Sequence, residues 1–184
     1  ATPASDAAMA SRMESIGLVA QVTGAPARIY FDLADTSGAS FESFSARPWE
    51  FGIVPIAFID AISADERTTV FAACRQWAPA GVACIPRTNE PVYVRITNDD
   101  DGCYAKVGMA TSGAQTLNLG AGCWRQGTIA HELGHTLGLI HEHQRADRDT
   151  YVTIALENVE DGYESNFTRV VTSRLWTPYD FGSV

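Results

Sequence analysis

The pattern of hydrophobic and polar positions divides the chain near residue 49. Residues 1–48 are rich in Ala, Ser and Thr and contain one short strand candidate, ARIYFDL. After that point four runs resemble strands in length and alternation, and we predict them at residues 52–60, 91–97, 103–109 and 114–120. From Tyr151 onward the pattern is irregular, which predicts loops rather than long elements.

Two further stretches repeat apolar residues at helical spacing. The first, residues 63–78, begins with Ser63 as an N-cap, and Glu66 completes a capping box three residues later. The second, residues 127–140, carries one apolar stripe, which consists of Ile129, Leu133, Leu137 and Ile140. The sequence therefore predicts two amphipathic helices.

Composition and charge narrow the class of protein. Of the 184 residues 46% are hydrophobic and 19% charged, so we expect a well-filled interior in one compact domain with room for two lobes. The net charge of −9 argues against nucleic acid and anionic membranes as partners. No apolar run approaches ~18 residues, which predicts that the chain has no membrane span. Nothing in the sequence sets the oligomeric state.

The four cysteines, Cys74, Cys84, Cys103 and Cys123, form an even set without a C-x-x-C pair. This spacing disfavours a cysteine zinc site and leaves two alternatives, which are two disulfides or four buried thiols. We favour two disulfides, and with them an oxidising compartment.

All four histidines lie within thirteen residues. His131 and His135 are one helical turn apart, so both imidazoles leave the same helix face, and Glu132 completes the pattern H-E-x-x-H. Gly138 accepts a positive φ cheaply, so it can end the helix and turn the chain back toward the same point. His141 can then approach from a third direction, and the full pattern H-E-x-x-H-x-x-G-x-x-H has a chance frequency of about 10⁻⁶ over the chain.

Three imidazoles are the ligand set of a catalytic zinc site, because they leave one position for water and substrate. We therefore predict one Zn²⁺ per chain on His131, His135 and His141, with Glu132 as the general base. A structural zinc module is the weaker alternative, since structural sites usually have four protein ligands and Glu132 would then have no role. His143 fits no ligand position. We interpret it as a histidine that is either exposed to solvent or contacts a metal ligand without binding the metal itself.

The stretch HELGHTLGLIHEHQRADRDTYVTI resembles the astacins, a family of secreted zinc endopeptidases within the metzincins. The likeness continues at NVEDGYESNF and YDFGSV and extends upstream to WEFGIVPI, so it covers roughly residues 49–184. It implies an α+β metzincin-like fold: a twisted mixed β-sheet with a backing helix, an active-site helix and an open cleft. The upper lobe would occupy about residues 49–140, and residues 141–184 would form the first part of the lower lobe.

The resemblance also assigns roles to further residues. It implies a disulfide between Cys103 and Cys123, and it makes Cys74 an added partner for Cys84. It places Glu142 below the site, where the family senses the mature N-terminus. The strand above the cleft would offer a free edge to an extended substrate, and the residues predicted for that edge are Gln115, Thr116, Leu117, Asn118 and Leu119.

The two ends of the chain leave a second functional hypothesis open. Residues 1–48 are expected to be an extension whose residues 1–39 act as a retained pro-segment, with Asp32 or Asp35 reaching the zinc; each of these residues has the alternative of a solvated turn acid. The family continues from Ser-Val into a Met-turn, so the lower lobe is expected to be incomplete at Val184. The leading hypothesis is a secreted zinc-dependent endopeptidase that cleaves peptides or proteins. The alternative is a latent zymogen or an inactive zinc-binding protein of the same fold.

Overall fold

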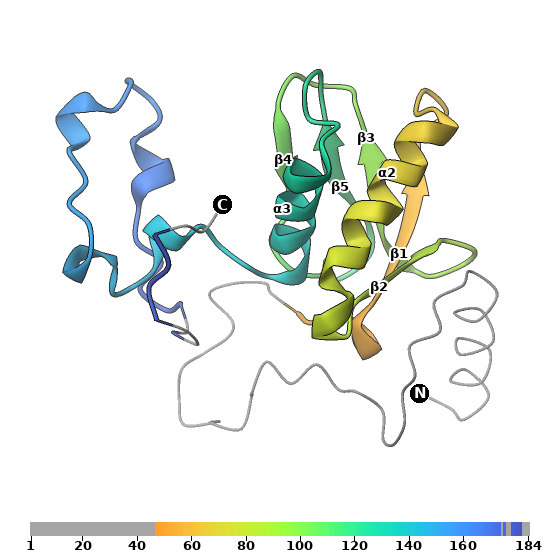
Figure 1. Ribbon diagram of the computed structural model, residues 1–184, viewed down its shortest axis with the longest axis horizontal. Helices are drawn as coiled ribbons and strands as arrows, with labels where there is room; N and C mark the ends of the chain where they lie inside the picture. The colour runs from red at the N-terminus through yellow and green to blue at the C-terminus, as the bar shows by residue number, and fades with distance from the viewer. Residues whose placement is uncertain (1–46, 174, 176–177, 182–184) are drawn as a thin grey trace.

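A mixed five-stranded sheet forms the frame of the molecule (Figure 1). The computed structural model describes residues 47–173, 175 and 178–181. The spatial order of the strands is β2-β1-β3-β5-β4; all neighbours are parallel except β4, which is antiparallel to β5. Their bounds are β1 Ile53–Phe58, β2 Ala83–Pro86, β3 Val92–Thr97, β4 Cys103–Ala105 and β5 Gly113–Leu119.

Two α-helices pack against each other and lie in front of the sheet in Figure 1. Helix α2 spans Ala64–Cys74, and the predicted capping box is confirmed, because the Ser63 hydroxyl accepts from the Glu66 backbone N–H while the Glu66 carboxylate accepts from the Ser63 N–H. Helix α3 spans Gln126–Leu137. The predicted α+β fold, with a mixed sheet, a backing helix and a second helix that carries the histidines, is confirmed.

The apolar core lies between the sheet and the helices. The strands contribute alternating aliphatic side chains, and the helices contribute the faces that carry Val70, Ile129 and Leu133. Full burial of one such side chain contributes about 1.5–3 kcal/mol relative to leaving it exposed. The core therefore fixes α3 to the sheet, and with it the face from which the histidines project.

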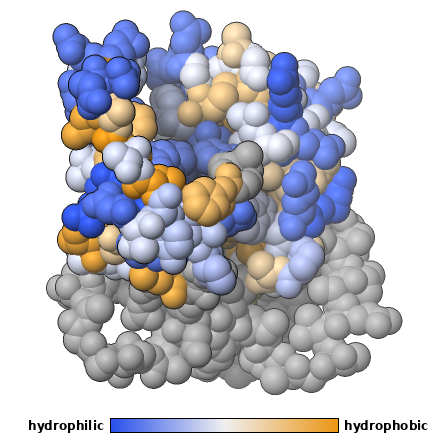
Figure 2. All heavy atoms as spheres, turned by 60° about the vertical axis from the view of Figure 1, so that its left-hand side comes forward, coloured by the Kyte–Doolittle hydropathy of each residue, from blue (hydrophilic) through white to orange (hydrophobic). Residues whose placement is uncertain are grey.

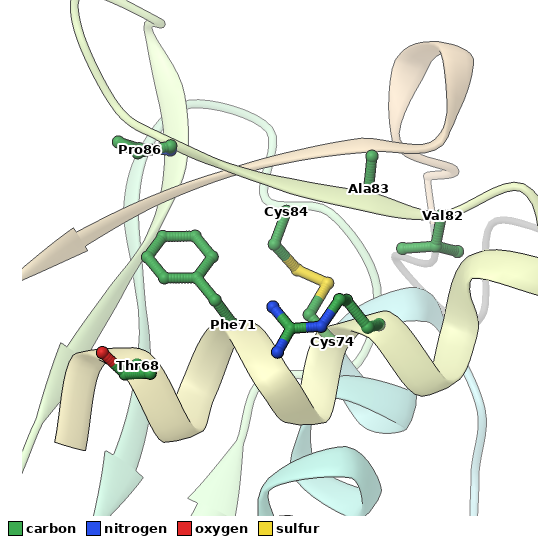
Figure 3. A pocket seen from close by; sticks show the side chains of 8 residues that line it. Thr68, Phe71, Cys74, Val82, Ala83, Cys84 and Pro86 are labelled. Atoms are coloured by element: carbon green, nitrogen blue, oxygen red, sulfur yellow. A yellow bond between two sulfur atoms is a disulfide. The ribbon is translucent and has the colours of Figure 1, made fainter. Parts of the chain in front are cut away.

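Both predicted disulfides are present. Cys103–Cys123 joins β4 to the segment before α3, and Cys74–Cys84 joins the end of α2 to β2. Figure 3 shows the second disulfide between α2 and β2, beside a cavity of about 350 Å³ that Phe71 and Pro86 help to line. The alternative of four buried thiols is thus excluded.

After α3 the described chain forms only short 3-10 turns, which confirms the irregular pattern expected from Tyr151 onward. Their bounds are η4 Glu142–Gln144, η5 Arg148–Thr150, η6 Leu156–Asn158 and η7 Glu164–Phe167. This part, drawn in blue in Figure 1, lies to one side of the sheet and helices. In Figure 2, which brings it forward, hydrophilic side chains cover much of the surface, with separate hydrophobic ones among them.

Three predicted element boundaries are wrong. The first helix changes after Cys74 to the 3-10 helix η3, Arg75–Ala80, because Pro79 has no N–H for an α-helical hydrogen bond. The strand predicted at residues 103–109 is β4, and it is only three residues long, since the chain turns at Gly108, whose φ is 71°. The second helix ends at Leu137, so Ile140 lies beyond it and does not belong to its core stripe.

The predicted substrate edge is also wrong. Strand β5 is not an edge strand, because it pairs with β3 on one side and with β4 on the other. The edge on this side of the described sheet is β4. Alternation within one strand does not show which other strands pair with it, and here β5 lies between β3 and β4.

Two predictions remain to be placed, the pro-segment switch and the absence of a membrane span. Asp32 and Asp35 lie outside the described residues, so a pro-segment switch stays a prediction. Within the described residues no helix combines the length and the hydropathy that a bilayer crossing needs.

Candidate metal centre

Helix α3 delivers the first two imidazoles to the cleft. Ile129, before His131, and Leu133, between the two histidines, are buried on the core side of the helix. His131 and His135 are therefore turned toward the opposite, partly exposed side. Their ring centroids are 4.6 Å apart, as one helical turn requires. The sequence prediction that both rings share one face is confirmed.

Gly138 ends the helix in the left-handed region, with φ 107°, and its N–H bonds to the carbonyl oxygens of Gly134 and His135. The Leu139 N–H bonds to the Gly134 oxygen at 3.0 Å, so the last turn is closed. This turn also brings the Leu139 carbonyl oxygen to 2.8 Å from Nδ1 of His135. An N–H at Nδ1 donates to that oxygen, which leaves Nε2 of His135 free to bind a metal.

His141 is the third imidazole, and the chain returns it to the first two. Its Nε2 is 3.2 Å from Nε2 of His135, and one nitrogen from each of the three rings lies within 4.8 Å of the others. Two nitrogens that bind one tetrahedral zinc at about 2.0–2.1 Å are roughly 3.3 Å apart. The donor set and its spacing therefore fit zinc.

Glu132 lies between the two helical histidines in sequence and is buried, with 4% of its surface exposed. Its Oε2 is buried and has no hydrogen-bond partner in the part of the chain that the structure describes. Burial raises the pKa of this carboxyl, and the nearby His135 and His131 oppose that rise. A buried carboxylate oxygen without a partner fits a group that holds and releases a proton in the cleft.

The surroundings of His141 favour its neutral form. Burial lowers the pKa of its imidazole, and the proximity of His135 lowers it further, while a hydrogen bond with Gln144 opposes the shift. A neutral imidazole is the form that binds metal. His143 stacks on His141 with centroids 5.2 Å apart, and its Nε2 donates to the Asn166 carbonyl oxygen at 2.9 Å. His143 thus lies beside the three-nitrogen cluster rather than in it.

A cleft of about 790 Å³ opens over the three imidazoles. Its upper wall comes from Tyr104 and Ala105 of β4 and from Val107, two residues after the strand ends, and Glu132 also lies in its lining. The opposite wall comes from η7 and the segment between η6 and η7, chiefly Val159, Glu160, Tyr163, Asn166 and Phe167. The second cavity, between α2 and β2, has none of the histidines in its lining.

The residues predicted for substrate binding, 115–119, serve the fold instead. Leu117 and Leu119 are fully buried in the core. The Gln115 amide accepts from the Ala110 N–H and donates to the Gly108 oxygen, and the Asn118 amide donates to the Asp100 and Gly102 oxygens. Thr116 is exposed, but its carbonyl oxygen accepts from Lys106, which lies after β4. These side chains hold the loops on either side of β4.

The sequence predicted β4 as a strand, but neither its place in the cleft wall nor the residues of the opposite wall. The one available signal for β4 at an edge was the acidic turn Asp99–Asp101 directly before a short run, since charged residues are common beside edge strands. The opposite wall had no signal, since its residues come from an irregular stretch.

Glu142 lies next to His141 but points to a different set of partners. Its Oε1 accepts from Arg145 at 2.8 Å and from the Asp180 backbone N–H at 2.8 Å. Arg145, which is buried, also forms a two-point ion pair with Asp147, with both N–O distances 3.0 Å. Glu142 is therefore part of the ion-pair group that joins residues 142–147 to residues 178–180.

Comparisons with known proteins agree with this geometry. A family model described as Astacin, a peptidase family, matches residues 41–184. Tolloid-like protein 2 of Mus musculus is 32% identical over 176 residues, which are 88% of this chain and 17% of that protein. Bone morphogenetic protein 1 of Xenopus laevis is 35% identical over 142 residues, which are 75% of this chain and 20% of that protein. The chain thus spans about a fifth of the length of these relatives.

Among solved structures, high choriolytic enzyme 1, a hatching enzyme zinc-protease from Oryzias latipes (Medaka fish), matches with a TM-score of 0.69 and 33% identity. The match covers 77% of this chain and 72% of that one. The family model reaches from before the first strand to the end of the chain and includes all three imidazoles and Glu132. The chain belongs to the astacin family of peptidases.

Proposed function

We propose that residues 49–184 are the catalytic domain of a secreted zinc-dependent endopeptidase, with residues 1–48 as an N-terminal extension. One observation carries the proposal: three imidazole nitrogens lie within 4.8 Å of one another beside Glu132, whose buried Oε2 has no hydrogen-bond partner among the described residues. A structural zinc site needs no such carboxylate. The two disulfides support an oxidising, extracellular location.

His131, His135 and His141 would hold the zinc, with Nε2 of His135 and of His141 as two of the donor atoms. Zinc bound there supplies Lewis acidity, which polarises a peptide carbonyl and acidifies water. Glu132 accepts a proton from the attacking water as the new C–O bond forms. It then gives that proton to the leaving nitrogen as the C–N bond breaks, so one water is consumed per peptide bond. Burial raises the pKa of Glu132, which makes the protonated state easier to reach before the second transfer.

An extended substrate would pair with the outer edge of β4 rather than with β5. β4 forms an outer edge of the described sheet, and Tyr104 and Ala105 line the cleft above the imidazoles. A free edge offers backbone N–H and C=O groups to a peptide of almost any sequence, which suits an endopeptidase. The opposite wall, with Glu160 and Tyr163, would then contact side chains of the substrate.

The replacement Glu132→Gln tests the proposal. It keeps the size of the side chain and all three imidazoles, so zinc should stay bound, while the proton acceptor is lost. General acid–base groups contribute typically ~10²–10⁴ in rate. Zinc content and peptide cleavage, with and without a chelator, should be measured on one preparation of a form that is active before mutation.

The matched control is Glu157→Gln, the same chemical change at an exposed residue of η6. We expect full zinc in both variants, with cleavage lowered at least a hundredfold only in Glu132→Gln. Near-normal cleavage by Glu132→Gln would mean that another group is the base. A wild-type chain that holds zinc but cleaves nothing would favour the zymogen or inactive alternative.

A further inference from the structure

The rings of His135 and His141 are fixed by different kinds of partner, and that of His141 is the side chain of Gln144. For His135 the acceptor at Nδ1 is a backbone carbonyl, that of Leu139, set by the turn at Gly138. For His141 the partner at Nδ1 is a side chain, the Oε1 atom of Gln144, at 3.3 Å. A side chain can hold an imidazole only if it is itself held, so the surroundings of Gln144 decide whether this contact orients the ring.

The 3-10 turn places Gln144 over His141. The Gln144 N–H bonds to the His141 carbonyl oxygen at 2.9 Å, and η4 covers Glu142–Gln144. His141 is the extended N-cap of this turn, with φ −63° and ψ 142°, and the hydrogen bond folds the chain back so that Oε1 of Gln144 lies 3.3 Å from Nδ1 of the His141 ring. The local backbone thus makes Gln144 the natural neighbour of this ligand.

The amide of Gln144 has only one orientation that satisfies both of its ends. Its Nε2 donates to the Asn166 carbonyl oxygen at 3.1 Å, and that oxygen can only accept. The opposite end of the amide, Oε1, then faces His141 and can only accept, so Nδ1 of His141 must carry the hydrogen. Nε2 of His141 is left without a hydrogen and points toward Nε2 of His135, at 3.2 Å.

The Asn166 carbonyl oxygen, which accepts from the Gln144 amide, is itself held by further contacts. It also accepts from Nε2 of His143, and its residue lies in η7. The Val170 N–H bonds to the Gln144 carbonyl oxygen at 2.7 Å, so the backbone of Gln144 is tied to the same segment by an independent hydrogen bond. Main chain and side chain of Gln144 can therefore be tested separately.

We propose that Gln144 is a positioning residue for His141: its amide, held by the Asn166 carbonyl, keeps Nδ1 of His141 protonated and presents Nε2 to the metal. The proposal rests on the proposed zinc site. Partners of this kind typically change metal affinity 10–100-fold when they are removed.

The test is Gln144→Met in the full chain, which keeps the length of the side chain and removes both polar atoms. Gln144→Glu keeps an acceptor toward His141 but loses the donor to Asn166. Gln76→Met is the matched control, the same change at an exposed residue of η3. Zinc affinity is measured by competition with a chelator, and exchange of the His141 Nδ1–H with solvent is followed by NMR on the zinc-loaded protein.

We expect Gln144→Met to bind zinc 10–100-fold more weakly and to lose protection of the His141 Nδ1–H, with the Val170 amide still protected. Gln144→Glu should lie between it and the wild type, and Gln76→Met should match the wild type. Unchanged zinc affinity in Gln144→Met overturns the proposal. Loss of Val170 protection together with zinc also overturns it, because Gln144 would then act by holding the loop. A wild-type chain that binds no zinc refutes the proposed function instead.

Discussion

Residues 49–137 form a sheet and two α-helices around an apolar core, whereas the described residues from 141 onward form short turns joined by polar contacts. In the described chain the last buried hydrophobic side chain is Leu133, and the buried residues after α3 are two arginines, Arg145 and Arg148. The first region is also cross-linked by both disulfides. The second is held by guanidinium groups that reach backbone oxygens and carboxylates.

The candidate metal centre lies where these two regions meet. His131 and His135 come from the helix that the core fixes, and His141 comes from the first turn of the polar region. Hydrophobic burial is strong and non-directional, whereas the polar contacts are weaker one by one but depend on geometry. Two of the three imidazoles are thus placed by packing and the third by hydrogen bonding. The site can then depend on local order in the second region without loss of the fold.

The largest effect we expect is from His141→Ala, which removes the only ligand contributed by the polar region. Two imidazoles on one helix face cannot hold the ion as three do, so zinc affinity should fall more than a hundredfold. The loss of affinity is measured as the amount of zinc that remains bound per chain after dialysis against a chelator. The control is His143→Ala, two positions later, which should keep most of its zinc. If His143→Ala loses zinc while His141→Ala keeps it, the ligand assignment is wrong.

The next effect concerns stability and compares one apolar side chain from each region. Ile96→Ala, in β3 and fully buried, should lower the free energy of unfolding by about 2–5 kcal/mol, because it leaves a cavity in the core. Val171→Ala, at a residue that is 72% exposed, should change it by less than about 0.5 kcal/mol. Urea unfolding of the full chain measures both. Equal effects would show that an apolar core also holds the second region.

A smaller and local effect is expected from Arg148→Met. Arg148 donates to the His143 carbonyl oxygen at 2.9 Å and pairs with Asp149 at 2.8 Å. Removing it takes the donor away from the part-buried carbonyl oxygens of His143 and Phe167, at a cost of up to about 1–3 kcal/mol. Hydrogen exchange should speed up in residues 143–169 and stay unchanged in β3.

Arg169→Met is the matched control, because Arg169 pairs with the same Asp149 but is far more exposed. An exposed ion pair contributes about 0–1 kcal/mol, so the control should have little effect on exchange. Equal acceleration in the two variants would argue that charge, not the buried contacts of Arg148, holds the turns.

The smallest effect is a dependence on pH. The Arg145 guanidinium holds the pKa of the Asp147 carboxyl below its ordinary value of 3.8. The unfolded chain then binds the proton more readily than the folded one, so this contact stabilises the fold above about pH 3.8, and the contribution is lost as pH falls through the lower folded pKa. Backbone amides of residues 142–147 should lose protection in that acid range, and Asp147→Asn should remove this part of the pH dependence. An unchanged acid profile in Asp147→Asn would exclude the ion pair as the cause.

Local elements were predictable wherever the cause lies within a few residues. The capping box at Ser63 and Glu66 and the turn at Gly138 depend on neighbours three or four positions away, and both are present. The pairings Cys103–Cys123 and Cys74–Cys84 were also correct, the first through the family resemblance. The length of the first helix was predicted wrongly because Pro79, which ends the α-helical hydrogen bonding, lies after the run of apolar residues from which the helix was predicted.

The sequence by itself determined the chemistry of the site, since the spacing of His131, His135, Gly138 and His141 sets which groups can meet through the geometry of one helix and one turn. Only the tertiary structure decided which strand faces the cleft and what holds His141. Strand order depends on hydrogen bonds between segments far apart in sequence, so the alternation of β5 could not show that β4 covers its edge. Likewise the Asn166 carbonyl, 22 residues after Gln144, became its partner only through folding of an irregular segment without periodicity.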